Sequence, residues 1–378
     1  MTSIRQRLSA VAVAAGLTLA AACGGSSDAG SDSGNDAAAD SAAVAKAKAD
    51  YDTYANGTPK IGITEPLNAP VPTGKTIDFI ACAPAACLEV PKRMQEAAEK
   101  IGWKVNIITA QADPGSVQAA FAQAVRNKPD VVAYGGFELV TIQRQVKELK
   151  DLGIPVIATA ITEEIGEETG ILANVRGPNY QKLVGKALAA AVIKETKGKA
   201  NIGFVDISYF PIYSFVKEGF DEAMDEYCAE CSIKVTDMPV TSIGKDASTR
   251  LLNFLRANPK INSLVAVADG VNLGLPAAMK SAGIADKVKL FSGTPTAANL
   301  PFVASGAESA VVPIPYDEAG WIMVDASIRA LLGMSLEESS SAEAMPTVLL
   351  TKDNLTSTTE IETLVPDHQE IFLKLWGK

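Results

Sequence analysis

Hydrophobic and polar positions divide the chain of 378 residues into three zones. Residues 1–22 begin basic and become almost wholly apolar, residues 24–49 are small and polar, and the remainder alternates apolar runs with amphipathic segments. In the third zone, a buried-strand run such as 130–134 (DVVAY) follows a segment with apolar residues at helical spacing, such as 116–127. Such alternation is typical of parallel sheets built from βαβ units.

The alternation predicts the following elements. Strands are expected at 76–81, 103–109, 130–134, 154–160, 201–206, 233–238, 263–268 and 288–292. Helices are expected at 91–101, 116–127, 141–152, 180–196, 215–227, 245–258 and 275–282. The series of βαβ units occurs twice, once before about Thr162 and once after it. We therefore predict an α/β fold of two doubly wound parallel-sheet lobes with a cleft between them. In such sheets, ligands bind beyond the carboxyl ends of the strands.

The N-terminal zone reads as a secretory signal. It has two arginines within residues 1–7, an apolar run to residue 22 and small residues directly before Cys23. A cysteine at that place resembles the lipobox of a bacterial lipoprotein, although Ala20 stands where Leu is usual. We predict a lipoprotein signal peptide over 1–22 and a lipid on Cys23, with an ordinary cleaved signal and a chance cysteine as the alternative. The run is shorter than the ~20 residues of a spanning helix.

The second zone predicts a tether. Residues 24–49 are mostly Gly, Ser, Ala, Asp and Asn and contain no aromatic residue. Such a segment buries too little apolar surface to offset the entropy lost on ordering. We therefore expect residues 23–74 to be the lipidated cysteine and a flexible linker. The body would then lie outside the cytoplasm, anchored to the cell membrane.

Four cysteines follow Cys23. Cys228 and Cys231 form a C-x-x-C motif, which in the cytosol would indicate metal or redox chemistry. Outside the cytoplasm a structural disulfide is the better interpretation. We favour two short local bridges, Cys228 with Cys231 and Cys82 with Cys87.

Composition argues against catalysis and nucleic-acid binding. The net charge is −10 at pH 7, and no basic cluster is interleaved with aromatics. The only histidine, His368, lies near the C-terminus, so a nucleophile-histidine arrangement has little support. Neither a Walker A loop nor a dinucleotide fingerprint is present. We expect no enzymatic activity, no cofactor and no metal. The glutamates at 163, 164, 167 and 168 are interpreted as a solvated face rather than a calcium site.

Seven short segments occur in the order typical of one family. They are 128–133 (KPDVVA), 152–157 (LGIPVI), 218–223 (EGFDEA), 257–262 (ANPKIN), 268–274 (ADGVNLG), 282–284 (AGI) and 293–295 (GTP). With these segments the body resembles a type I periplasmic-binding protein of the ribose and galactose group, the solute receptors of ABC importers. Repressors that share this body carry an N-terminal helix-turn-helix, where this chain has a signal and tether.

The resemblance implies a hinge of several chain crossings, near Ala160, Ile314 and Pro346. It places an N-terminal lobe at 75–160 plus 315–345. It places a C-terminal lobe at 161–314 plus 346–378.

Several polar or aromatic contacts of the sugar receptors are replaced in this chain. Where those receptors have an Asn and two Phe after the first strand, this chain has about Pro84, Ala86 and Cys87. Other departures fall at Ala160, Ile161, Ser214, Val216, Ala268, Ser292 and Ile314. A closed cleft must satisfy each sugar hydroxyl or lose affinity. We therefore predict a ligand less polar than a monosaccharide, such as an aromatic, terpenoid or steroid-derived compound with one hydroxyl, ketone or carboxylate.

Candidate ligand contacts follow predicted strands or occupy the contact positions of the family. Tyrosine joins an apolar ring to a polar tip, which suits an apolar site with a few placed polar groups. The aromatic candidates are Phe137, Tyr209, Phe210, Tyr213 and Tyr316. The other candidates are Cys82, Pro84, Glu89, Glu138, Thr159, Ile161, Asp269, Ser292, Thr294 and Ile314. The aromatics at 209, 210 and 213 could instead pack under a loop, and Glu89 could be a first-turn helix acid.

These observations predict a monomeric, extracytoplasmic substrate-binding lipoprotein of an ABC transporter. Contacts from both lobes would favour the closed state. The closed form would deliver a small-molecule ligand to a membrane permease served by a separate ATPase. The alternatives are a conventional sugar receptor and a receptor that presents its closed form to a sensor kinase.

Overall fold

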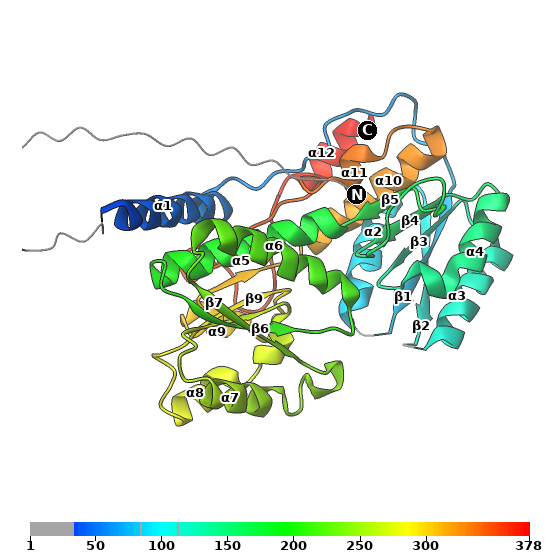
Figure 1. The fold of residues 1–378 in the computed structure, drawn as a ribbon. Coiled ribbons are helices and arrows are strands. Elements are labelled where there is room, and N and C mark those ends of the chain that lie inside the picture. The colour runs from blue at the N-terminus through cyan, green and yellow to red at the C-terminus, as the bar shows by residue number, and fades with distance from the viewer. Residues whose placement is uncertain (1–33, 84, 112) are drawn as a thin grey trace, which may run out of the picture.

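The protein is built on two sheets of five parallel strands each (Figure 1). The structure is a computed structural model that describes residues 34–83, 85–111 and 113–378. The first sheet has the order β2-β1-β3-β4-β5 and the second β10-β9-β8-β6-β7. This confirms the predicted fold class. The signal peptide and Cys23 lie outside the described residues, as does Pro84.

The first lobe contains the earlier strands. They are β1 (Thr76–Cys82), β2 (Lys104–Ala110), β3 (Val131–Gly135), β4 (Val156–Thr159) and β5 (Ala173–Val175). Its helical elements are η1 (Ala85–Leu88), α2 (Glu89–Glu99), α3 (Pro114–Asn127), α4 (Leu139–Asp151), α10 (Tyr316–Leu332), α11 (Glu337–Ser340) and α12 (His368–Leu375). Helices α3 and α4 cover one face of the sheet, and α2 and α10 cover the other (Figure 1).

The second lobe repeats this arrangement. Its strands are β6 (Asn201–Asp206), β7 (Ser232–Asp237), β8 (Ser263–Ala266), β9 (Lys289–Gly293) and β10 (Ala310–Val312). Its helices are α5 (Pro178–Thr196), α6 (Ser214–Tyr227), α7 (Ala247–Ala257), α8 (Leu275–Ser281) and α9 (Leu300–Ala304). Three short turns, η2 (Pro211–Tyr213), η3 (Val240–Ser242) and η4 (Asp269–Asn272), follow strand ends. Helices α5 and α6 lie on one face, and α7 and α8 on the other (Figure 1).

Glycines allow α5 and α6 to pack closely. A Cβ at Gly185 of α5 would lie 2.1 Å from the carbonyl oxygen of Val216, and one at Gly219 of α6 would lie 2.2 Å from that of Lys182. Real side chains do not tolerate such distances, so both positions need glycine. The close contact fixes these two helices against the second sheet.

The first chain crossing lies later than predicted. Strand β5 pairs with β4, with Thr159 opposite Val175, so residues up to Val175 belong to the first sheet. The boundary predicted at 160/161 is therefore wrong, and the chain passes to the second lobe between β5 and α5. A strand of three residues behind an acidic loop carries too little periodicity to be recognised.

The C-terminal end does not follow the predicted division either. Trp376, directly after α12, stacks on Trp321 of α10 with 5.4 Å between ring centroids, and its indole N–H donates to Asp325 at 2.8 Å. The end of the segment 346–378 thus packs on the first lobe, whereas Leu350 bridges to Val311 of the second. An apolar helix face can be recognised in sequence, but its partner cannot.

The predicted tether contains a docked helix. Helix α1 (Gly34–Asn56) lies along α5 and α6 (Figure 1). Ala47 and Tyr51 are buried, and the ammonium of Lys194 lies 4.5 Å from the ring centroid of Tyr51. The Tyr227 hydroxyl donates to Asp50 at 2.5 Å. The flexible-linker prediction is therefore wrong for the part of the tether that the structure describes, because Val44, Ala47 and Tyr51 recur at helical spacing and pack against the core.

The segment after α1 continues onto the first lobe. Gly62 donates its N–H to Ala344, and Leu67 donates to Leu375. The indole N–H of Trp103 donates to the Pro72 carbonyl at 2.6 Å. Residues 42–74 consequently form a strap that contacts both lobes.

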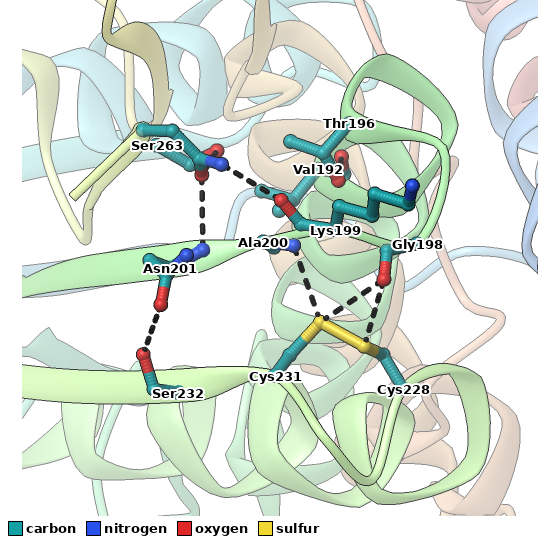
Figure 2. Close-up of a disulfide and its surroundings, with 11 residues drawn as sticks. Val192, Thr196, Gly198, Lys199, Ala200, Asn201, Cys228, Cys231, Ser232 and Ser263 are labelled. Atoms are coloured by element: carbon teal, nitrogen blue, oxygen red, sulfur yellow. Dashed lines mark hydrogen bonds between the residues drawn. A yellow bond between two sulfur atoms is a disulfide. The ribbon is translucent and has the colours of Figure 1, made fainter. Parts of the chain in front are cut away.

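Both predicted disulfides are confirmed. Cys82 is bonded to Cys87, joining the end of β1 to η1, and Cys228 is bonded to Cys231 between α6 and β7. Figure 2 shows the second bridge, where the N–H of Ala200 at the start of β6 donates to Cys231 Sγ at 3.3 Å. The bridges fix two loops locally. Among the described residues, no helix has the length and apolar character needed to cross a membrane.

The docking of α1 predicts a stability effect. Tyr51→Ala in the full chain should lower the free energy of unfolding by about 3 kcal/mol, because it removes a buried aromatic ring. Urea unfolding followed by fluorescence measures the change. Lys48→Ala, on the exposed side of the same helix, serves as the control and should change stability by less than about 0.5 kcal/mol. An unchanged midpoint for Tyr51→Ala would show that α1 does not stabilise the folded state.

Candidate functional site

The candidate site lies where the chain passes between the lobes. One crossing joins β5 to α5, the second joins β10 to α10, and the third brings Leu350 beside β10. Strands in each sheet are parallel, so their carboxyl ends meet at one edge of each lobe. Loops from both lobes therefore converge beside the crossings.

Four polar side chains from different segments gather there. Burial raises the pKa of Tyr316 to about 12, and the charge of Arg176 opposes this rise while Tyr213, Glu89 and Asp269 add to it. Burial also raises the pKa of Tyr213, opposed by the Thr294 side chain and by Arg176. Arg176 follows β5, Tyr213 ends η2, Asp269 begins η4 and Tyr316 begins α10. The predicted candidates Tyr213, Asp269, Thr294 and Tyr316 are thus brought together around an arginine.

Asp269 is fully buried. Its Oδ2 accepts the backbone N–H of Thr296 at 2.7 Å, and its Oδ1 is buried with no hydrogen-bond partner among the described residues. Burial raises the pKa of this carboxyl to about 8, and the nearby charge of Glu308 adds to the rise. At neutral pH Asp269 is therefore largely protonated and can donate a hydrogen bond.

Glu308 forms a second buried carboxyl beside it. It accepts from the Ser292 hydroxyl at 2.6 Å and from the Asn272 amide at 3.0 Å. Burial raises the pKa of Glu308 to about 7, while these two hydrogen bonds lower it. The hydroxyl of the predicted contact Ser292 is therefore engaged inside the second lobe.

The first lobe contributes residues at the ends of β3 and β4. Thr159 is buried with its hydroxyl unpartnered among the described residues, and Ile161 is buried. Phe137 is also buried, and Glu138 accepts from the Thr162 hydroxyl at 2.5 Å. These predicted contacts lie at the carboxyl ends of β3 and β4 or just after them, in the first lobe.

A cavity of about 490 Å³ lies at the first crossing between the lobes. Its lining comprises Thr162, Glu163, Glu164, Ile165, Asn174, Gly177, Pro178, Asn179, Phe215 and Ser340. None of the predicted ligand contacts lines it. Glu163 accepts the N–H of Leu139, and its half-buried carboxyl has a pKa raised by burial, so the acidic run is not solvated throughout.

The remaining candidates have different surroundings. Tyr209 is 49% exposed and meets Phe210 edge to face, and Phe210 in turn meets Tyr213. The Glu89 carboxylate pairs with Lys92 at 2.9 Å in the first turn of α2, as the alternative interpretation expected. Cys82 is held in its disulfide. Ile314 lies in the second crossing and is buried.

Arg176 was missed by the sequence analysis. The error in placing the first crossing hid it, because residues 161–177 were read as a loop of the second lobe. The nearest signal was the short run 171–175 (ILANV), which ends in Arg-Gly-Pro at a helix start but is too short to identify a strand by its pattern. Arg176 has φ of 61°, and its Nε is buried without a hydrogen-bond partner among the described residues.

The arrangement is suited to binding. The His368 ring packs edge-on against Trp321 and hydrogen-bonds to the Val365 carbonyl, rather than to Tyr213 or Tyr316. Within the described part of the chain, no three His, Cys, Asp or Glu side chains gather as metal ligands would. The site instead offers hydroxyls, a guanidinium and a protonated carboxyl beside aromatic rings.

Comparison with known proteins shows relatives with the same fold. A D-apiose import binding protein of Actinobacillus succinogenes is 22% identical over 263 residues, covering 69% of this chain and 82% of that protein. An Agrobacterium vitis solute-binding protein with bound allitol has a TM-score of 0.63 at 19% identity, covering 80% and 99% of the two chains. A glucose-galactose binding protein from Geobacillus stearothermophilus also has a TM-score of 0.63, at 18% identity, covering 76% and 100%.

Residues 87–334 match the family described as a periplasmic binding protein domain. The match covers both lobes and the first two crossings. The chain therefore belongs to the periplasmic-binding protein family, in its type I form.

Proposed function

We propose that this protein is the extracytoplasmic solute-binding component of an ABC transporter. It captures a small organic solute between its lobes and delivers it to a membrane permease served by a separate ATPase. The observation that carries this proposal is the convergence of Arg176, Tyr213, Asp269 and Tyr316 from separate segments at the crossings. The apiose importer and the allitol complex among its relatives support a solute-binding role.

Closure of the two lobes is the proposed mechanism. A ligand that touches both lobes binds the closed form better and shifts the population towards it. The three crossings absorb the rotation, since each lobe keeps its own sheet. The buried polar atoms of Thr159 and Asp269 that lack partners then meet the ligand.

The ligand is proposed to be less polar than a monosaccharide. Ile161 and Ile314 are buried where the sugar receptors have polar contacts. Phe210 and Tyr213 meet edge to face and offer ring surface. An aromatic, terpenoid or steroid-derived compound fits these features. A conventional sugar ligand is the alternative that the relatives favour.

Membrane attachment is proposed through a lipid on Cys23. The stretch from Cys23 to the start of α1 can span at most about 40 Å. Because α1 packs on the second lobe, the lipid would hold that lobe near the membrane surface. A receptor held in this way could also present its closed form to a sensor kinase, although no contact in the structure favours that use over transport.

Thermal unfolding against a panel of compounds tests the ligand class. A ligand at a hundredfold excess over Kd should raise stability by about 2.7 kcal/mol. We expect this shift with aromatic or steroid-derived compounds and none with pentoses, hexoses or alditols. Tyr213→Ala should weaken the binding tenfold or more, whereas Leu152→Ala on the exposed surface should not. A shift with a sugar alone would keep the receptor function and refute the less polar ligand.

Substitution of Cys23 tests the anchor. In the bacterium that makes the protein, Cys23→Ser should move it from the membrane fraction to the soluble fraction, because the lipid attachment atom is lost. Ser27→Ala should leave it with the membrane. Retention of the Cys23→Ser protein in the membrane fraction would contradict lipid anchoring.

The buried carboxyls predict a dependence of stability on pH. The folded-state pKa values of Asp269 and Glu308, about 8 and about 7, lie above those of an unfolded chain. Their contribution to the free energy of unfolding is therefore complete below about pH 4 and declines as pH rises towards 8. Asp269→Asn should make the fall of the unfolding free energy with pH shallower, by about 1.4 kcal/mol per pH unit between pH 5 and 7. Urea unfolding at each pH measures it, with the exposed Asp151→Asn as the control, and identical slopes for wild type and Asp269→Asn would refute the assignment.

A further inference from the structure

Arg176 is a cation that the described part of the fold does not neutralise. Its Nε is buried without a hydrogen-bond partner, and its guanidinium forms no ion pair with any described residue. Arg329, whose whole side chain is buried, contrasts with it, because the Nε of Arg329 pairs with Asp325 at 2.6 Å. A buried N–H donor without a hydrogen-bond partner destabilises a fold, so a protein retains one where a partner arrives later.

The backbone at this position adds to that cost. Arg176 has φ of 61°, in the left-handed region that favours glycine. It lies between β5 and α5, at the first crossing between the lobes. Strain of this kind concentrates at ligand-binding positions. The strain and the missing partner are separate observations on one residue, and both point to a ligand.

The surroundings of Arg176 supply hydrogen-bond donors rather than a counter-charge. Its charge acts on the phenols of Tyr180, Tyr213 and Tyr316. The Tyr180 hydroxyl is buried and lacks a partner among the described residues. Three phenols and a guanidinium together favour a ligand group that accepts hydrogen bonds.

The acidic residues nearby do not cancel the positive charge. Burial raises the pKa of Asp269 to about 8, so this carboxyl is largely neutral at pH 7. Glu89 is already paired with Lys92. Glu318, near Tyr180, accepts the N–H of Val365, and burial raises its pKa to about 7. The site is therefore positive as well as rich in donors.

We propose that Arg176 binds an anionic group of the ligand, and that the solute is an organic acid. Its carboxylate lies on the guanidinium, whose planar fork matches two carboxylate oxygens. Its apolar or aromatic body lies against Phe210, Tyr213 and Tyr316. This inference rests on the proposed solute-binding function. It narrows the ligand class to compounds with one negative charge, since Arg176 supplies a single positive charge.

The test compares acids with their neutral analogues. The purified full chain is titrated with benzoate, phenylacetate and cholate, each beside its primary amide, and with D-ribose, D-galactose and allitol. Binding is measured by calorimetry and by thermal shift. We expect at least one acid to bind and its amide to bind at least tenfold more weakly. Arg176→Gln should weaken binding of that acid about 10- to 100-fold, because a hydrogen-bonded charge pair is lost.

Two further variants separate ligand binding from a structural role. Arg144→Gln, an exposed arginine on α4, should leave the affinity unchanged. Arg176→Met without ligand should be at least as stable as the wild type, since the buried N–H donor that lacks a partner is removed. A lowered melting temperature for Arg176→Met would show that Arg176 stabilises the fold itself and would overturn the proposal.

The remaining outcomes distinguish the two proposals. Equal binding of acids and amides, or binding of a sugar or alditol that Arg176→Gln leaves unchanged, would overturn the organic-acid assignment and leave the receptor function standing. The absence of binding by every compound would count against both.

Discussion

The polypeptide passes between two parallel sheets, and this constraint organises the rest of the molecule. Parallel strands place their carboxyl ends at one edge of each sheet, and a chain that leaves one edge for the other lobe must cross beside both. Arg176 and Tyr316 lie at the first two crossings for this reason. Residues distant in sequence therefore meet in the region between the lobes.

Burial of polar groups in that region has an energetic consequence. Asp269 and Thr159 are buried with atoms that lack partners among the described residues, and Arg176 lies with them. Each such group destabilises the lobe interface when no ligand is bound. A bound solute that forms hydrogen bonds with these groups removes that penalty, and the removal adds to its affinity.

The strap formed by residues 42–74 adds a constraint of its own. Helix α1 is fixed on the second lobe through Ala47 and Tyr51, and the chain beyond it bonds to the first lobe through Gly62 and Leu67. Gly62 bonds to Ala344, near the third crossing, so the strap runs beside the hinge. Rotation of one lobe against the other must therefore carry the strap with it, and the proposed membrane anchor is tied to the second lobe.

The sequence alone determined the two-lobe α/β architecture and the disulfide pairings, and it proposed several members of the candidate site. Short apolar runs such as 130–134 and amphipathic segments such as 116–127 carry local periodicity, which physics links directly to strands and helices. Tyr213, Asp269 and Tyr316 could be named because they follow such elements or known contact positions.

Only the tertiary structure placed Arg176, the helix α1 and the C-terminal Trp376. Strand β5 is too short to carry a pattern, and its identity comes from pairing with β4. Helix α1 is defined by its contact with α5 and α6, and Trp376 by stacking on Trp321. The periodicity of a sequence records which face of an element is buried. Contacts between residues far apart in the chain decide which partner buries that face. They also decide which charged group, here Arg176, has no ion-pair partner among the described residues.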